Sequence, residues 1–315
     1  MVRRRILSVG KTQYCVRAGV SRLDTDRREA SSGKCVFSSG GGGALAAVAF
    51  SKLGLDSVLC SKIGSDLNGG LIRQSLTDLG VDVRFLLSDT RRRTGARIII
   101  ADNDGNEEQT VFEGAGAALV RDDIEDAFTC YPDAVYIRAD MSEELIGDVL
   151  GFAQEQGAAI YFDGRGCKKF EFCKEEMPLL EMLILDQDDV FAYCGIEPDD
   201  MQSCFDAVIK LSVDMRVRNV VLSLGERGCV LYDGKYMEVA ASLRDPFDVA
   251  DASTVRAAFS GALISLHMSG ADAKRILRGA EAAVALVAAG DRQIDSLPSS
   301  SEISAFLLER QETEE

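Results

Sequence analysis

The sequence predicts an α/β fold in which a mostly parallel central sheet lies between two layers of helices. Short runs rich in Val, Ile and Leu alternate with stretches of helical periodicity through most of the 315 residues, and this alternation is typical of parallel strands joined by helices. The length suits one large core or two modest ones. We expect a single domain over residues 1–310 and a polar tail at 311–315.

Each expected strand is a short apolar or β-branched run, and each expected helix carries apolar residues at helical spacing. The first helices end at Gly54 and Gly80, because glycine accommodates the turn out of a helix. Strands are expected at residues 6–9, 57–63, 96–101, 109–112, 134–138, 158–163, 182–186, 219–223 and 229–232. Helices are expected at residues 44–53, 67–79, 143–156, 199–213, 254–268, 271–289 and 301–308.

Two segments interrupt this alternation and predict a small β-lid beside the main sheet. Residues 11–37 are polar and lie between a strand and a helix, and they are too long for an ordinary connection of about four to six residues. Residues 97–112 form a pattern of two strands around a turn at 102–105. We expect the two segments to form the lid together.

Charge and composition exclude several classes of partner. The chain is 46% hydrophobic and 27% charged, which is a globular composition, and its net charge of −16 repels nucleic acid and anionic membranes. No apolar run approaches the roughly 20 residues that span a bilayer. No secretory leader precedes the first strand. We therefore expect a cytoplasmic protein with neither nucleic acid nor membrane as a partner.

The cysteines and the single histidine do not predict a metal or catalytic centre. The nine cysteines are odd in number and scattered, without a CxxC pair, so neither a disulfide framework nor a zinc site is expected. His267 lies in an apolar helical pattern, where packing is its simpler role. Catalysis by a Ser–His or Cys–His pair is therefore not expected.

A glycine run at residues 40–43 opens directly into a helix, so that a ligand can approach the backbone amides there. A flexible hinge would have the same composition, but a series of further motifs follows it. These are Ser61 to Gly69, Leu79-Gly-Val-Asp82, Thr94-Gly-Ala-Arg97, Asp102-Asn-Asp-Gly105, Gly114-Ala115 and, further along, Asp163 and Ser223-Leu-Gly-Glu-Arg-Gly228. In order and spacing the series resembles the ribokinase-like (PfkB) carbohydrate kinases over about 300 residues.

This resemblance implies a ribokinase-like three-layer αβα sandwich and ATP-dependent phosphorylation of a sugar or similar alcohol. In the family an aspartate at a helix start takes the proton of the hydroxyl, and Gly-Ala-Gly amides before it hold the phosphoryl group. The matching segment places Ala257 at the base position, and Thr254, Val255 and Arg256 replace the Gly-Ala-Gly segment. Asp251 is the fallback carboxylate. The segment is typical of an ordinary helix start.

The sugar side departs from the family as well. The glycine motif implies ligand contacts at Gly41 and Gly42. Cys15 stands where the family often has a sugar-binding aspartate, and Leu45 stands where it has an asparagine. Both changes remove hydrogen-bond partners for a polyol.

The nucleotide side keeps more of the pattern. The resemblance assigns Ser223, Gly225 and Gly228 to nucleotide binding, and Arg256 could hold a phosphate through its side chain. The motif that orders magnesium and phosphate in the family corresponds to Asp186-Gln-Asp-Asp189. Asp186 and Asp189 could hold Mg²⁺ through water, or the segment is simply an acidic loop after a strand.

Two hypotheses of function follow. In the first, the protein is a sugar-kinase homologue with a degenerate transfer site, weakly active or non-catalytic, that binds a sugar- or nucleoside-like ligand. In the alternative it is an active carbohydrate or nucleoside kinase that uses ATP, Mg²⁺ and a relocated carboxylate such as Asp251. The resemblance also implies a homodimer joined through the lid.

Overall fold

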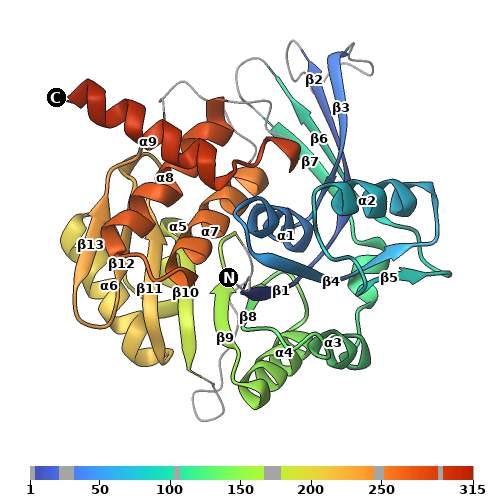
Figure 1. The fold of residues 1–315 in the computed structure, drawn as a ribbon, viewed down its shortest axis with the longest axis horizontal. Helices are drawn as coiled ribbons and strands as arrows, with labels where there is room; N and C mark the ends of the chain where they lie inside the picture. Colours follow the sequence, from blue (N-terminus) through green and yellow to red (C-terminus); the bar gives the residue numbers. More distant parts are fainter. Residues whose placement is uncertain are drawn as a thin grey trace.

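The structure is a computed structural model that describes residues 4–20, 32–102, 107–166, 179–244, 252–289 and 294–314. Asp251 lies outside the described residues, as do most of the predicted turn at 102–105 and residues 21–31 of the predicted lid. Figure 1 shows a large central sheet between helices and a smaller sheet that projects from it.

The central sheet has nine strands and is mostly parallel. The two pairs that involve β12 are antiparallel, and the other six are parallel. The spatial order is β13 (Met237–Ala240), β12 (Cys229–Tyr232), β11 (Val217–Ser223), β10 (Leu180–Asp186), β9 (Ala159–Asp163), β8 (Ala134–Arg138), β1 (Arg5–Val9), β4 (Asp56–Gly64) and β5 (Leu86–Asp89).

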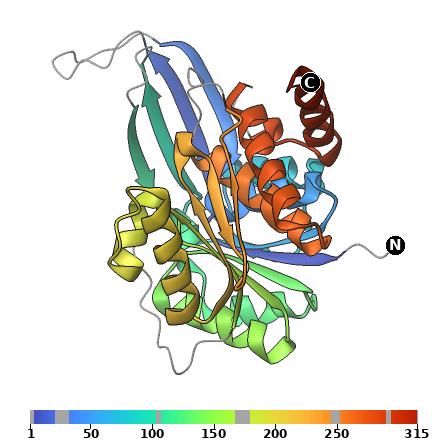
Figure 2. The ribbon, with the colours of Figure 1, turned by 90° about the vertical axis from the view of Figure 1, so that its left-hand side faces the viewer.

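Helices cover both faces of this sheet and create two hydrophobic cores (Figures 1 and 2). Because neighbouring side chains of a strand point to opposite faces, Ile6 of β1 belongs to one core and Leu7 to the other. The first core includes α1 (Gly42–Lys52), α2 (Leu67–Asp78), α7 (Ala252–Met268), α8 (Ala273–Ala289) and α9 (Ser300–Glu314). The second includes α3 (Arg121–Phe128), α4 (Glu143–Gln156), α5 (Gln187–Cys194) and α6 (Met201–Asp214).

The smaller sheet is the predicted β-lid, and it contains four strands. Their order is β3 (Ser32–Gly40), β2 (Gln13–Val20), β6 (Gly95–Ala101) and β7 (Glu107–Phe112). β2 and β6 pair in parallel, and the two outer pairs are antiparallel. The three-layer arrangement and the lid confirm the fold class that the sequence predicts.

Several elements differ from the sequence prediction in number or length. The strands β5 and β13 and the helices α3 and α5 are additional, and three short 3-10 turns lie at Gly114–Ala118, Gly225–Arg227 and Ile294–Ser296. Each of these elements has three to eight residues, which is too few to show a clear period in the sequence. The last helix, α9, continues to Glu314, so residues 311–314 belong to a helix where the sequence analysis expects a tail.

Close backbone contacts bring the start of α1 to the end of β1. A Cβ atom on Gly43 would lie 2.7–2.8 Å from the backbone of Gly10, so only glycine allows this approach. Gly41 precedes α1 with a φ of 93°, a conformation that side chains disfavour. The glycine run therefore joins the lid to the main sheet at a tight corner.

The single histidine has a packing position. His267 Nδ1 lies 2.9 Å from the Tyr161 hydroxyl, and Nε2 lies 3.3 Å from the Asn219 amide nitrogen. Burial lowers the pKa of His267 in spite of the nearby Glu181 carboxylate.

Four cysteines (Cys60, Cys130, Cys204 and Cys229) are buried in the two cores. In the described ranges no helix is both long enough and apolar enough to cross a bilayer.

Candidate functional site

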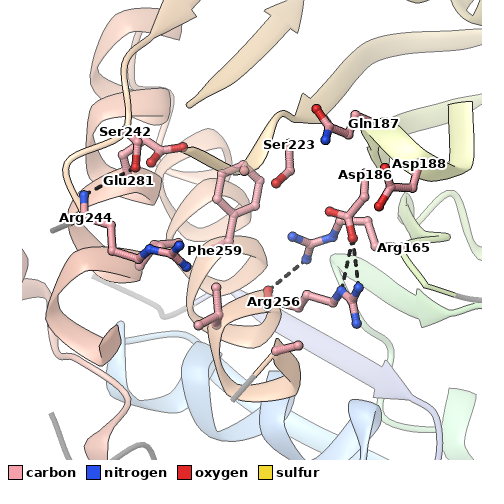
Figure 3. A pocket seen from close by; sticks show the side chains of 14 residues that line it. Arg165, Asp186, Gln187, Asp188, Ser223, Ser242, Arg244, Arg256, Phe259 and Glu281 are labelled. Carbon is pink, nitrogen blue, oxygen red and sulfur yellow. Dashed lines mark hydrogen bonds and ion pairs between the residues drawn. The ribbon is translucent and has the colours of Figure 1, made fainter. Parts of the chain in front are cut away.

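Two neighbouring cavities lie near the carboxyl ends of the central parallel strands, where α/β folds commonly bind ligands. The first, which we call the β11 cavity, has a volume of about 260 Å³ and is lined by Asp186, Ser223, Gly225, Arg244 and Glu281, among others (Figure 3). The second, which we call the lid cavity, has a volume of about 250 Å³ and is lined by Lys11, Gly42, Arg97, Arg138 and Asp140, among others. Arg256 lines both cavities.

The lid cavity lies between the smaller sheet and the start of α1. Gly41 and Gly42, which the glycine motif assigns to ligand contact, line it. Cys15 and Leu45 line neither cavity. Leu45 is buried in the α1 core because the first turn of the helix directs it inward. Cys15 packs against Gly40, where an added Cβ would lie 2.4 Å from its Sγ.

Ala257, which the resemblance places at the base position of the family, lies inside a regular helix. Ala257 lines the lid cavity, and α7 already begins at Ala252. In a helix that begins there, N–H groups from Arg256 onward bond to carbonyls four residues earlier. The segment of Thr254, Val255 and Arg256 is thus helical, and within the described chain α7 has no acidic residue in its first turn. The fallback Asp251 is not described.

Arg256 points from α7 to the end of β10, across the boundary of the two cavities. Its Nε and Nη2 donate to Asp186 Oδ2 at 3.1 and 3.0 Å (Figure 3). The guanidinium also lies against Gly166, where an added Cβ would be 2.9–3.0 Å from it. A cation therefore lies just before Ala257, in the segment for which the resemblance implies an amide cup.

Asp186 and Asp189, the residues that the sequence analysis offers for Mg²⁺, lie at the end of β10 and in the first turn of α5, which follows β10 without a loop. Asp186 is bonded to Arg256, and Asp189 accepts a hydrogen bond of 2.8 Å from the Gly166 amide. Asp188 lines the β11 cavity, whereas Asp189 does not. Among the described residues no cluster of three or more acidic, His or Cys side chains could hold a metal ion. With Asp186 bonded to a guanidinium, this arrangement does not fit a Mg²⁺ site.

The β11 cavity contains part of the predicted nucleotide loop. Ser223 at the end of β11 and Gly225 line it. Gly228 lies behind them with a φ of 93°, and an added Cβ would lie 1.9 Å from the Ala240 carbonyl oxygen. Gly228 therefore shapes the loop while Ser223 and Gly225 face the space. Burial raises the pKa of Glu281 on α8, a lining residue that sequence reasoning missed, to about 7.

A buried polar network connects β8 and β9 to α7 beneath the cavities. Asp163 accepts hydrogen bonds from Arg165, Arg138, Tyr136 and Ser260 at 2.8–3.1 Å. Burial alone would raise the pKa of Asp163, but the two guanidiniums and these hydrogen bonds hold it well below its usual range. Arg165 also donates to the Arg256 carbonyl oxygen at 2.8 Å. The network therefore fixes the start of α7.

Asp140 is a second charged residue that the sequence analysis did not identify. It follows β8 by two residues and lines the lid cavity, and its buried Oδ1 atom has no hydrogen-bond partner in the structure. Burial raises the pKa of Asp140 to about 6, although Arg138 and Lys11 oppose the shift. The sequence feature that could have identified Asp140 is its position just after an expected strand, because ligands bind at the carboxyl ends of the strands in such sheets.

Comparison with known proteins identifies relatives along nearly the whole chain. Residues 3–299 match the pfkB family of carbohydrate kinases. An ATP-dependent ribose-1-phosphate kinase of Halopiger xanaduensis is 26% identical over 309 residues, which cover 97% of this chain and 99% of that protein. A nucleoside kinase of Methanothermobacter thermautotrophicus is 24% identical over 274 residues, which cover 84% and 82% of the two chains.

Solved structures show the same fold. The ribokinase of Arabidopsis thaliana complexed with ribose and ATP has a TM-score of 0.85 and 21% identity, and the match covers 98% of this chain and 99% of that one. The ribokinase of Cryptococcus neoformans in complex with ADP has a TM-score of 0.77 and 18% identity, with 96% and 99% covered. Because the family match spans nearly all of the sequence, the chain belongs to the pfkB family of carbohydrate kinases.

Proposed function

We propose that this chain binds a sugar- or nucleoside-like ligand in the lid cavity and a nucleotide in the β11 cavity, without transferring phosphate between them at an ordinary enzymatic rate. The observation that carries the proposal is the start of α7. Ala257 lines the lid cavity at the position that corresponds to the base of the family. The preceding residue is Arg256, and its guanidinium is bonded to Asp186. Such a protein would act by binding, as a regulatory or assembly component.

The size of the expected loss supports this proposal. Removing a general base costs about 10²- to 10⁴-fold in rate, and removing an oxyanion-type donor costs about 10²- to 10³-fold. The two losses do not multiply cleanly, because groups that act together are not additive. Even the larger loss taken alone would make the protein a poor kinase.

Nucleotide binding rests on the β11 cavity and on the relatives. Ser223 and Gly225 line that cavity, and the two ribokinase structures are described with ATP or ADP. ATP or ADP is therefore the proposed nucleotide. Mg²⁺ would have to displace Arg256 from Asp186 in order to use that carboxylate.

Restoring the lost groups tests the proposal. The purified wild type would be incubated with ATP, Mg²⁺ and ribose, fructose, nucleosides or ribose 1-phosphate, and ADP formation would be measured. We expect little turnover in the wild type and a gain in the double variant Arg256→Gly with Ala257→Asp. The control Ala252→Asp adds a carboxylate at the first residue of α7 and should gain nothing. Wild-type turnover at about 1–100 s⁻¹, an ordinary kinase rate, would contradict the proposal.

The alternative is an active kinase with a relocated proton acceptor. It is favoured by the match to a ribose-1-phosphate kinase over 97% of the chain. In this case the wild type turns over and Asp251→Asn abolishes the activity, whereas Ala257→Asp adds little. The same assay therefore distinguishes the two functions.

We also propose that the chain forms a homodimer through the lid. Arg97 and Val111 line the lid cavity, so the alternate residues of β6 and β7 point to the outer face. On that face Phe37, Ile98 and Phe112 are 59%, 39% and 56% exposed. Apolar side chains exposed together on one sheet face favour a protein–protein contact.

A further inference from the structure

A third cavity lies between four helices that cover the same face of the central sheet (Figure 1). Leu53 at the end of α1 lines it, together with residues of α7, α8 and α9, and we call it the α9 cavity. Among the described residues it shares no lining residue with the lid cavity or the β11 cavity. Its volume is about 210 Å³. Because an apolar cavity of about 150 Å³ can hold a benzene ring, this space is large enough for a small organic molecule.

Close contacts hold the helices around the α9 cavity. Ser300 Oγ at the start of α9 donates to the Leu53 carbonyl oxygen at 3.2 Å. Gly279 of α8 lies against Leu266 of α7, where an added Cβ would be 2.3 Å from Leu266 Cδ1. All four of these residues line the cavity. The space is thus a built part of the helical layer and does not result from a loosely attached helix.

The walls of the α9 cavity combine apolar side chains with one unsatisfied hydroxyl. Ser265 of α7 lines the cavity, and its buried Oγ atom has no hydrogen-bond partner among the described residues. Buried hydroxyls are normally paired, so this one is available to a ligand or to a water that accompanies it. The hydroxyls of Ser269 and Ser304 also line the cavity, but each donates to a carbonyl oxygen three or four residues earlier, at 2.7 and 2.8 Å. The apolar lining residues are Leu53, Ala262, Leu266, Ile303 and Leu307.

Cations of α8 lie where the α9 cavity opens. Arg275 lines both this cavity and an adjoining open space of about 470 Å³, which Lys274 and Arg278 also line. In the described ranges, none of these three side chains forms an ion pair or a hydrogen bond. Asp272 is the single described acidic residue that lines the adjoining space, and its Oδ1 accepts from the Arg275 amide at 2.8 Å. The opening is therefore net positive in a chain whose net charge is −16.

From this arrangement we infer that the α9 cavity binds a small organic acid, with an apolar ring or short chain between the four helices and a carboxylate at Arg275. Burial favours the apolar part of such a ligand, and a guanidinium without a protein partner can hold the carboxylate by two parallel hydrogen bonds. The inference goes beyond the proposed function and does not depend on it, because the acid would occupy neither the lid cavity nor the β11 cavity.

Titration calorimetry on the whole chain, with three matched probes, tests the inference. Phenylacetate has a ring and a carboxylate, whereas 2-phenylethanol lacks the charge and acetate lacks the ring. We expect phenylacetate to bind about tenfold or more tightly than either of the others, with an affinity that falls as salt rises. A cavity that holds only water would bind phenylacetate no more tightly than acetate, and this result would overturn the inference. Equal affinities for phenylacetate and 2-phenylethanol would also overturn it, because the cations would then add nothing.

Three variants locate the binding site. Arg275→Gln should weaken phenylacetate binding about tenfold or more and leave 2-phenylethanol binding nearly unchanged. Arg256→Gln removes the cation that lines both other cavities and should leave phenylacetate binding unchanged. The matched control Arg218→Gln removes an exposed arginine that pairs with Glu181 at 3.0 Å, and it should also have no effect. Full phenylacetate affinity in Arg275→Gln, or its loss in Arg256→Gln, would contradict the inference.

Discussion

Arg256 and Asp186 form an ion pair between residues 70 positions apart, with Nη2 and Oδ2 at 3.0 Å, where the lid cavity meets the β11 cavity. Both side chains remain partly exposed, so ligands in either cavity can reach them. An anion in either cavity competes with Asp186 for the same guanidinium. The ion pair thus connects two binding spaces through a single cation.

Sharing this cation predicts that the two ligands weaken each other. With ribose 5-phosphate saturating as an anionic probe that competes for Arg256 from the lid cavity, the Kd for ADP should rise about threefold to tenfold, and linkage requires the reverse effect to be equal. In Arg256→Gln the coupling should fall to about zero, although each affinity can change. Calorimetric titration of ADP with and without the sugar phosphate measures this effect. Coupling that persists unchanged in Arg256→Gln would show that another group transmits it.

The buried network predicts a large loss of stability when Asp163 is replaced. Asp163→Asn removes the carboxylate that faces Arg165 and Arg138. Breaking a buried ion pair by changing one partner costs about 3–5 kcal/mol in the free energy of unfolding. Urea denaturation would measure this loss. Lys210→Gln, which breaks an exposed pair with Asp214, should cost less than about 1 kcal/mol, and equal losses in the two variants would refute the argument.

The raised pKa of Asp140 predicts a specific dependence of stability on pH. Its pKa is about 6 in the folded protein against 3.8 for the ordinary group, so between these values the folded state binds more protons than the unfolded state. Stability from this group is therefore present near pH 4 and is lost as pH rises through 6. At about 1.4 kcal/mol per pKa unit, the shift from 3.8 to about 6 corresponds to a loss of about 3 kcal/mol.

Asp140→Asn should remove this loss. We expect the variant to match the wild type near pH 3.5 and to be more stable at pH 7.5 by about 2–3 kcal/mol. Unfolding by urea at the two pH values compares them. If the variant is less stable at both, the carboxylate stabilises the cavity through its cationic neighbours more than burial destabilises it.

The apolar outer face of the lid predicts variants that separate a dimer. Phe112→Lys or Phe37→Lys places a charge on this face and should convert the dimer to a monomer, as measured by light scattering after gel filtration. Leu67→Lys changes a side chain on α2 that is 78% exposed and should leave the mass unchanged. A wild type that stays monomeric at high concentration would rule out the dimer.

The large features of the fold were predictable because they depend on local patterns. Strand runs, helix periods and the long polar segment before α1 predict the layers and the lid. The glycine run predicts only that a ligand can approach the backbone, and the structure adds that the backbone of Gly10 approaches Gly43. Short elements such as β5, with four residues, lack enough of a period to be recognised.

The charged lining of the site was less predictable, because it depends on contacts between distant residues. Lys11, Arg97, Arg138 and Asp140 are ordinary strand-end or lid residues in the sequence, and only the topology brings them together. Cys15 shares the sheet face of Gln13 but packs against Gly40. A position matched to a family motif therefore does not by itself show whether its side chain lines the cavity.

The short connections of the smaller sheet have a consequence for the ligand space. β1 leads into β2 through residues 10–12, and β3 leads into α1 through Gly41 alone. Lys11 and Gly41 lie in these two connections and line the cavity. The corner that joins the two sheets is therefore itself part of the cavity wall, so substitutions that alter this corner alter the ligand space as well.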